Sequence, residues 1–449
     1  MKNPKQLQRL LVLVSLLALL VNFICGPVMA HEKPVYEHNY YSRLFVPRPD
    51  QGAIQQILKL LINRKYSDAK LITRMIATPQ AVWFVGGTPD STEQYARDIV
   101  SRAAMQHSIP VLVTYNIPFR DCAQFSAGGA TSVEQYKAWI DAIAAGLGDA
   151  QAIIILEPDS LGIIPWYTNL DGNLEWCQPA EADSATVAND RFVMLNYAIE
   201  TLKANPNASV YLDGTHNAWL SVGDISQRLL RAGVQTVDGF FLNVSNFQYT
   251  ANLTQYGTWV SSCIEYATVI SAGDFNGCPN QYWNGGPLPS LIAQLFGEWN
   301  GVALSPQGEW SDTATDQVLN TSGINLRYAN LLGAVQPTTH FVIDTSRNGQ
   351  GPWLPTVSYP DPQEWCNPPG RGLGLRPSLH AGVPLLDAYL WVKIPGQSDG
   401  SCTRGRGPTG ARVDPEWNRV DPTAGAWFPE MALELARKAV PPLGNPVLF

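Results

Sequence analysis

The sequence is poor in charge, and it lacks the spacings that mark metal and phosphate sites. Charged residues make up 15% of its 449 residues. It has no Cys-x-x-Cys pair and no His-x-x-x-His spacing, although zinc sites commonly use such spacings. The segment VGGTPD at 85–90 is too short for a glycine-rich phosphate loop after an apolar strand. We therefore expect neither a metal nor an organic cofactor.

Long apolar runs are absent after residue 30, but one is present before it. The chain begins MKNPKQLQRLLVLVSLLALLVNF and reaches VMA at 28–30, directly before His31. A basic start, an apolar run and small final residues are typical of a secretory signal peptide, here cut after Ala30. Because the run is rather long, an uncleaved anchor is the alternative. We expect secretion, with the periplasm as a transit compartment, and no membrane contact once 1–30 is removed.

Basic residues are scarce in the expected mature chain, 31–449. Removing 1–30 takes away three basic residues and no acid, which leaves 27 basic against 38 acidic residues and a net charge near −11. Such a charge argues against nucleic acid and anionic membranes as partners. Six cysteines remain, and an even number in an exported chain favours disulfides. They are Cys122, Cys177, Cys263, Cys278, Cys366 and Cys402.

The chain also lacks a Pro/Thr/Ser-rich linker, an internal repeat and a low-complexity block. The 37 Gly, 34 Pro, 17 Tyr and 14 Trp of the sequence suit a compact extracellular domain with long ordered loops. The length would allow two domains, but barrels often exceed the usual domain size. We expect 31–449 to form one domain and to act as a monomer.

Seven short apolar runs rich in Val, Ile and aromatic residues are present. They do not alternate polar and apolar residues, so they indicate strands buried on both faces, as in a parallel sheet. Strand–helix alternation gives a βα barrel or an open doubly wound sheet, and the missing phosphate loop favours the barrel. The runs occupy 81–85, 110–115, 152–156, 209–213, 239–243, 340–344 and 389–393.

Helical patterns occupy the segments between several of these runs. Ser91 and Ser132 are the expected N-terminal caps of two helices, and Gly146 or Gly148 is expected to end the second. The helical patterns lie at 52–65, 91–107, 132–148 and 226–234.

Aspartates stand at or just beyond the ends of five predicted strands. The C-terminal ends of parallel barrel strands gather on one face, where active sites are built. Taken singly, each aspartate could be a cap or a loop residue, but five at equivalent places indicate a common site. They are Asp121, Asp159, Asp213, Asp344 and Asp399.

Several carboxylates without metal ligands suit acid–base chemistry on a neutral substrate. Glycoside hydrolysis needs a protonated and an ionised carboxyl group, and crowding raises the pKa of one of them. Trp219, Trp353 and Trp365 fall in Gly- and Pro-rich loops, where their rings could stack on sugars or simply pack. Asp213 and His216 could form a hydrogen-bonded couple, for which a structural or sugar-binding role is preferred over that of a base.

Two stretches resemble the signatures of glycoside hydrolase family 6, whose cellobiohydrolases and endoglucanases cut β-1,4-glucan with inversion. They are VTYNIPFRDCAQFSAGG at 113–129 and IIILEPDSLG at 153–162. The resemblance implies a distorted, incomplete barrel of about seven parallel strands, with long loops over its C-terminal face. Further matches in chain order are YLDGTHNAW (211–219), NVSNF (243–247), EWCNPPGRGLGLRPS (364–378), WVKIPGQSDG (391–400) and AGAWFPE (424–430).

The resemblance also implies roles for individual residues. Asp159 matches the proton-donating acid, and Asp121 matches the aspartate that keeps this acid protonated and helps order the attacking water. Tyr115 matches the tyrosine that distorts the sugar ring. Asp399 matches the candidate base, whose role is disputed in the family. The positions that match sugar-binding residues are Asp213, His216, Trp219, Asn243, Trp365, Lys393 and Gln397.

The sequence departs from the family pattern at several of these places. Ala127 stands where a serine often holds the water, which leaves Ser126 beside it as the candidate for positioning the water. Gln397 replaces the usual glutamate. Val222 stands where fungal members can carry a further tryptophan platform, and Phe45 is the candidate for an N-terminal platform.

The resemblance implies the disulfides Cys122–Cys177 and Cys366–Cys402, and Cys263–Cys278 remains as the third pair. We expect an inverting β-1,4-glucanase that binds cellulose and its oligosaccharides, without a separate carbohydrate-binding module. A cellobiohydrolase that releases cellobiose from chain ends, the non-reducing ones by resemblance, is preferred over an endoglucanase. A binding protein that has lost catalysis is the other alternative, supported only by Ala127 and Gln397.

Overall fold

The computed structural model describes residues 43–282, 302–406 and 413–444. The expected signal peptide 1–30 lies outside these residues. Within them, no helix combines the length and the apolar content that a membrane crossing requires.

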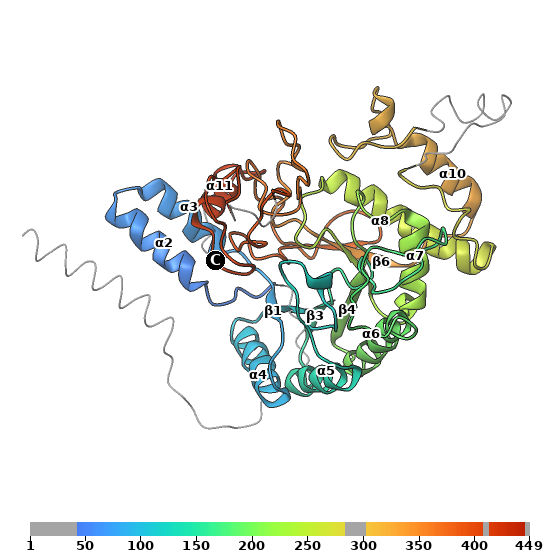
Figure 1. The fold of residues 1–449 in the computed structure, drawn as a ribbon, viewed down its shortest axis with the longest axis horizontal. Coiled ribbons are helices and arrows are strands. Elements are labelled where there is room, and N and C mark those ends of the chain that lie inside the picture. The colour runs from blue at the N-terminus through green and yellow to red at the C-terminus, as the bar shows by residue number, and fades with distance from the viewer. Residues whose placement is uncertain (1–42, 283–301, 407–412, 445–449) are drawn as a thin grey trace, which may run out of the picture. The chain divides into compact units, whose positions relative to one another are not determined.

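Seven parallel strands form one sheet, in which each strand pairs with the next along the chain (Figure 1). β1 and β7 are its edges, and no strand pairing joins them within the described residues. Next to this seam, the Ala81 N–H donates to the Trp391 carbonyl (2.9 Å) and the Trp83 indole N–H to the Val392 carbonyl (2.8 Å). The sheet is therefore an incomplete barrel, which confirms the expected fold class. The strands are β1 (Val82–Phe84), β2 (Val111–Thr114), β3 (Ala152–Leu156), β4 (Ala208–Asp213), β5 (Gly239–Leu242), β6 (His340–Asp344) and β7 (Leu386–Leu390).

Both faces of the strands are apolar because each face meets its own core. In β3, Ile154 packs into the cluster shared with the outer helices, whereas Ile153 and Ile155 pack into the cluster inside the barrel. β2 follows the same rule, with Leu112 outside and Val113 inside. This two-sided burial explains why the runs show no polar–apolar alternation.

Helices cover the sheet and its open seam. α4, α5 and α6 lie side by side along the outside of the barrel (Figure 1). α2, α3 and α11, which come from opposite ends of the described chain, share a separate apolar cluster that includes Trp391. The longer helices are α2 (Gln51–Ile62), α3 (Tyr66–Ile76), α4 (Pro89–Met105), α5 (Val133–Leu147), α6 (Val187–Lys203), α7 (Val222–Arg231), α8 (Thr250–Glu265), α10 (Ser322–Leu332) and α11 (Pro429–Arg437). Short helical turns are η1 (Asp121–Ala123), η2 (Val234–Thr236), η3 (Tyr266–Ile270) and η4 (Gln317–Leu319).

One predicted cap is confirmed and the other is wrong. Ser132 caps α5 by accepting a hydrogen bond from the Gln135 N–H, and Gly148 ends this helix with φ +53°. Ser91 lies inside α4, whose cap is Thr88. The helix starts earlier than predicted because Pro89 suits its first position, where the missing N–H costs nothing.

The last strand, β7, begins and ends three residues earlier than the predicted run 389–393. Val392 and Lys393 leave the ladder, since their N–H groups donate to the carboxylate of Asp344 at 3.2 and 3.0 Å. The apolar character of the run reflects burial rather than strand pairing.

Long segments follow the C-terminal ends of three strands: 157–186 after β3, 345–385 after β6 and 391–428 after β7. Two disulfides, Cys122–Cys177 and Cys366–Cys402, fix parts of them. The structure contains Cys122–Cys177, Cys263–Cys278 and Cys366–Cys402, as expected.

Candidate active site

A cavity of about 430 Å³ lies at the C-terminal ends of the strands. It brings together most of the side chains that the sequence singled out. Those that line it are Tyr115, Asp121, Ser126, Asp159, His216, Trp219, Trp353, Trp365, Lys393 and Asp399.

Asp159 lies three residues beyond the end of β3 and faces the cavity. The chain turns sharply here, because Glu157 (φ +54°) and Asp159 (φ +66°) both adopt the left-handed region. Strained residues of this kind cluster at functional sites. Burial, followed by the charges of Asp213 and Asp121, raises the pKa of Asp159 well above its usual value. The carboxyl group therefore keeps its proton to a higher pH than an ordinary aspartate and can donate it.

Asp121 opens the short helical turn η1, also with a left-handed backbone (φ +58°). Burial raises its pKa to about 6, although the Ser126 N–H, 2.6 Å from Oδ2, and the charge of Arg120 act in the opposite direction. The group is mostly ionised at neutral pH, so it can accept a hydrogen bond from water. Ser126 contributes to this site through its backbone as well as by lining the cavity.

Asp399 has the opposite electrostatic environment. Burial would raise its pKa, but Arg347 (2.8 Å) and Lys393 (3.1 Å) outweigh burial and lower it. A carboxylate held by two cations stays ionised but has little affinity for a proton. Since general bases work best with a pKa near the operating pH, this pairing weakens Asp399 as a base.

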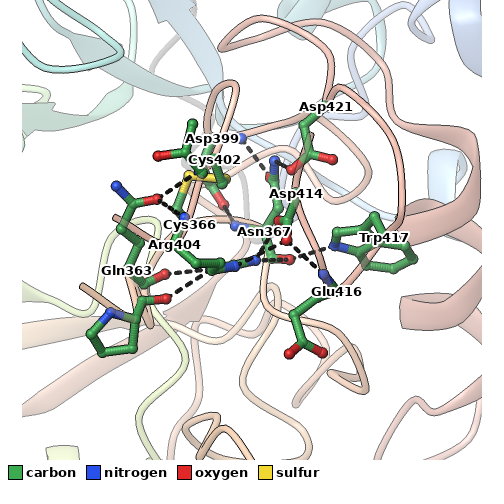
Figure 2. A network of polar contacts seen from close by, with 12 residues as sticks. Gln363, Cys366, Asn367, Asp399, Cys402, Arg404, Asp414, Glu416, Trp417 and Asp421 are labelled. Atoms are coloured by element: carbon green, nitrogen blue, oxygen red, sulfur yellow. Dashed lines mark hydrogen bonds and ion pairs between the residues drawn. A yellow bond between two sulfur atoms is a disulfide. The ribbon is translucent and has the colours of Figure 1, made fainter. Parts of the chain in front are cut away.

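The buried Asn367 forms two hydrogen bonds with Asp399 (Figure 2). The Asn367 N–H donates to Asp399 Oδ2 at 3.0 Å, and Asn367 Oδ1 accepts the Asp399 N–H at 2.8 Å. Asn367 Nδ2 donates to Asp421 Oδ2 at 2.9 Å. Next to it, Arg404 forms a buried ion pair with Asp414 at 2.6 Å and donates to the Asn367 carbonyl. Asn367, from the segment that follows β6, thus fixes Asp399, and residues of the segment that follows β7 in turn fix Asn367.

His216 is neutral in this structure. Burial lowers its pKa to about 3, and Nδ1 accepts the Ala218 N–H at 3.2 Å, which leaves the proton on Nε2. Its ring lies 5.7 Å from that of Trp219. Trp219 in turn packs on Gly162, where an added Cβ would meet the indole at 2.5 Å, so only glycine fits there. His216 is therefore suited to donate a hydrogen bond rather than to act as a base.

Two of the five strand-end aspartates lie outside the cavity lining. Asp213 Oδ2 accepts the N–H groups of Leu161 (3.1 Å) and Gly162 (3.2 Å), and Oδ1 accepts that of Thr215 (2.9 Å). The expected couple with His216 is therefore not what satisfies Asp213. Asp344 likewise accepts backbone N–H groups from the segments that follow β5 and β7. Both are buried braces between neighbouring strand ends.

Two further predicted sugar-binding residues also lie outside the lining. Asn243 is fully buried: Nδ2 donates to the Asp344 carbonyl at 2.8 Å, and Oδ1 accepts the Gln248 N–H at 3.0 Å. Gln397 Nε2 donates to Asp50 Oδ2 at 3.1 Å. The structure gives both side chains protein partners, so any influence on a ligand is indirect.

Several lining residues were missed. Trp83 lines the cavity on β1 and stands edge-on to Tyr115, with ring centres 5.4 Å apart. Trp176 and Glu364 also line it. The one sequence feature that could have pointed to Trp83 is its place in the predicted strand 81–85, which two glycines follow. Phe45 was the wrong candidate, since it is buried in the core, and Val222 is buried in α7.

Comparisons with known proteins agree with this geometry. Residues 40–439 match the family profile of the glycosyl hydrolases family 6. Endoglucanase A of Thermobispora bispora is 31% identical over 374 residues, which cover 83% of this chain and 58% of that protein. Probable 1,4-beta-D-glucan cellobiohydrolase C of Neosartorya fischeri is 30% identical over 385 residues, covering 81% of this chain and 70% of that protein.

A solved structure extends the comparison. The endoglucanase Cel6 from Mycobacterium tuberculosis, in complex with methyl-cellobiosyl-4-deoxy-4-thio-β-D-cellobioside, has a TM-score of 0.58 and 28% identity. The match covers 88% of this chain and 97% of that one. The incomplete parallel barrel with acids at its mouth defines a glycoside hydrolase architecture. The chain belongs to glycosyl hydrolases family 6.

Proposed function

We propose that the chain is an inverting β-1,4-glucanase that hydrolyses cellulose, with Asp159 as the general acid. The observation that carries this proposal is a cavity at the strand ends lined by Asp159, Asp121 and several aromatic side chains, in which burial and neighbouring acids raise the pKa of Asp159. Membership of the family, and relatives named for glucanase activity, support it.

In the proposed mechanism, Asp159 gives its proton to the glycosidic oxygen as the bond breaks. Asp121 adds the negative charge that keeps this proton in place, and it orders the attacking water with its ionised oxygen. Tyr115, whose pKa is raised by burial, stays a neutral phenol against the distorted ring. Asp399 is the candidate base, although its two cations favour a supporting electrostatic role.

The proposed sugar contacts divide into direct and indirect ones. Trp219, Trp365, His216 and Lys393 line the cavity, where rings can stack and polar groups can meet hydroxyls. The other three expected sugar-binding residues do not line the cavity, and their side chains are hydrogen-bonded to protein groups. They are Asp213, Asn243 and Gln397.

Proton NMR during early hydrolysis of cello-oligosaccharides tests this function. An inverting enzyme releases the α-anomer first, because water attacks opposite the leaving group. Release of β-product first would contradict the proposed mechanism, and no hydrolysis of amorphous cellulose would contradict the activity.

We further propose chain-end cleavage with release of cellobiose. Two long loops on the cavity face are held by disulfides, Cys122–Cys177 and Cys366–Cys402, and fixed loops of this kind favour threading of a polymer. An endoglucanase is the second candidate, supported by the name of the Thermobispora bispora relative. Carboxymethyl cellulose separates the two: a rapid fall in viscosity with few soluble sugars indicates an endoglucanase.

Export and domain organisation complete the proposal. The mature protein begins at His31, acts outside the cell as a monomer, and carries its activity in one domain, 31–449. N-terminal sequencing of the secreted protein and its mass in solution check these points. An N-terminus other than His31, or a stable dimer, would correct them.

A further inference from the structure

Trp176 is a large apolar side chain that faces water at the cavity. It lies in the segment between β3 and α6, lines the cavity and is 56% exposed. Trp139, Trp259 and Trp391, in contrast, are almost completely buried. A ligand in the cavity that covers the exposed part of this indole would remove further apolar surface from water, which is favourable.

The backbone on both sides of Trp176 is fixed. Glu175 forms an ion pair with the fully buried guanidinium of Arg228, and its N–H donates to the Tyr167 carbonyl at 2.8 Å. On the other side, Cys177 is bonded to Cys122. The backbone that carries Trp176 is therefore held at both neighbours, so the segment need not be ordered when a ligand binds, and this lowers the entropic cost of binding.

The position of Trp176 relative to the other platforms follows from segment 162–166. Gly162, at its start, packs under the indole of Trp219. Trp166, at its end, donates its backbone N–H to the Cys177 carbonyl at 2.9 Å. Segment 162–166 therefore connects the residue that supports Trp219 to the residue that follows Trp176.

The support beneath this loop comes from α7. Arg228 of this helix holds Glu175, and Leu170 lies over Gly223, where an added Cβ would come within 3.4 Å of it. Arg228 also donates to the Leu161 carbonyl at 2.8 Å, two residues after Asp159. One guanidinium thus ties the segment that carries Trp176 to the segment that carries the proposed acid.

We propose that Trp176 is a sugar-stacking platform that binds a glucose unit of a β-1,4-glucan at the rim of the cavity, outside the units in contact with Asp159. This inference rests on the proposed function. Pyranose rings present a flat C–H face, and a rigid indole face matches it at small entropic cost. Because the platform is peripheral, it acts only on chains long enough to reach it.

Binding of cellotriose and cellohexaose to the Asp159→Asn protein tests the platform, because this background should hydrolyse the ligand on the order of 10²–10⁴-fold more slowly. Adding Trp176→Ala should raise the Kd of cellohexaose about 2- to 10-fold, the range expected for one aromatic contact, and leave cellotriose unchanged. Trp176→Phe should restore part of the affinity. Tyr66→Ala is the matched control, since Tyr66 is 62% exposed on α3 and does not line the cavity.

The outcomes separate the platform from the proposed function. An equal Kd for cellohexaose with and without Trp176→Ala overturns the platform and leaves the glucanase intact. A uniform loss for both oligosaccharides also overturns it, because the substitution would then act on the whole cavity. If the protein with Trp176 intact binds neither oligosaccharide, and the unsubstituted chain does not hydrolyse them, the proposed function fails as well.

Discussion

Asp159 and Asp399 face the same cavity, yet their surroundings change their pKa values in opposite directions. Asp159 is shielded from water and lies near other acids, so its pKa is raised. Asp399 is buried too, but it has Arg347 and Lys393 as partners, so its pKa is lowered. The comparison shows that burial does not decide which carboxyl group holds a proton. The cations decide it, and separated pKa values of this kind distinguish an acid from an ionised partner.

The largest expected effect comes from removing the proton of the acid. Asp159→Asn keeps the shape of the side chain but cannot donate a proton, so the rate should fall on the order of 10²–10⁴-fold. Affinity for oligosaccharides should stay nearly intact. Initial rates on cellotetraose, with Kd measured in parallel, check this prediction. Activity within a factor of about three of the wild type would mean that another group is the acid.

Substitution of the ion-paired Asp399 should lower the stability of the protein rather than remove a proton donor. Asp399→Asn leaves two buried cations without their carboxylate, and breaking a buried pair costs about 3–5 kcal/mol. Denaturant unfolding at neutral pH measures this loss. Asp159→Asn is the matched control and should not destabilise the protein, because it removes a carboxyl group that resists ionisation. Equal losses in the two variants would break the comparison.

The acids with raised pKa values should make the protein more stable at acidic pH. Burial raises the pKa of Glu157 to about 7 and those of Asp121 and Asp213 to about 6. A carboxyl group whose folded pKa is raised contributes stability below its unfolded pKa, and this contribution is lost as pH rises through the folded pKa. Glu157 alone accounts for about 3 kcal/mol between pH 4 and 7.

Urea unfolding at several pH values measures this slope. The free energy of unfolding should fall from about pH 4 to pH 7, and Glu157→Gln should flatten the fall. Only below the usual pKa of aspartate should Asp399 reverse the trend, because protonation then breaks its ion pairs. A stability maximum at neutral pH would show that these acids are ionised without cost.

The smallest effect is expected from the brace Asp213. Its charge is the largest electrostatic contribution to the raised pKa of Asp159, after burial. Asp213→Asn should therefore move the basic limb of the pH–rate profile to lower pH while the folded protein retains its activity at acidic pH. The same limb in Asp121→Asn serves as the reference. An unchanged basic limb would mean that Asp213 acts only on the backbone.

The barrel could be predicted from the sequence because its strands are uniformly apolar. The runs at 152–156 and 340–344 coincide with β3 and β6. The seventh strand was misplaced because Val392 and Lys393 are buried without pairing, and burial is all that an apolar run reports. Ser91 failed as a cap for a local reason, the preference of Pro89 for the start of the helix.

The site was predicted less completely, since contacts between distant segments decide it. Asp213 stands at the end of a predicted strand and Asp399 just beyond another, so the sequence treats them alike. Only the structure shows that backbone N–H groups satisfy the first and that cations hold the second. Trp83 and Trp176 carry no motif, and their exposure to the cavity depends on the barrel seam and on the Cys122–Cys177 loop.

The open seam between β1 and β7 has a consequence for biosynthesis. The helices that cover it come from both ends of the described chain: Gln56 of α2 donates to the Pro429 carbonyl, and Asp68 of α3 pairs with Arg437 of α11. A ribosome delivers α2 and α3 first and α11 last. The nascent chain therefore carries α2 and α3 with their apolar face uncovered while the seven strands are made, and this face is covered only when α11 emerges.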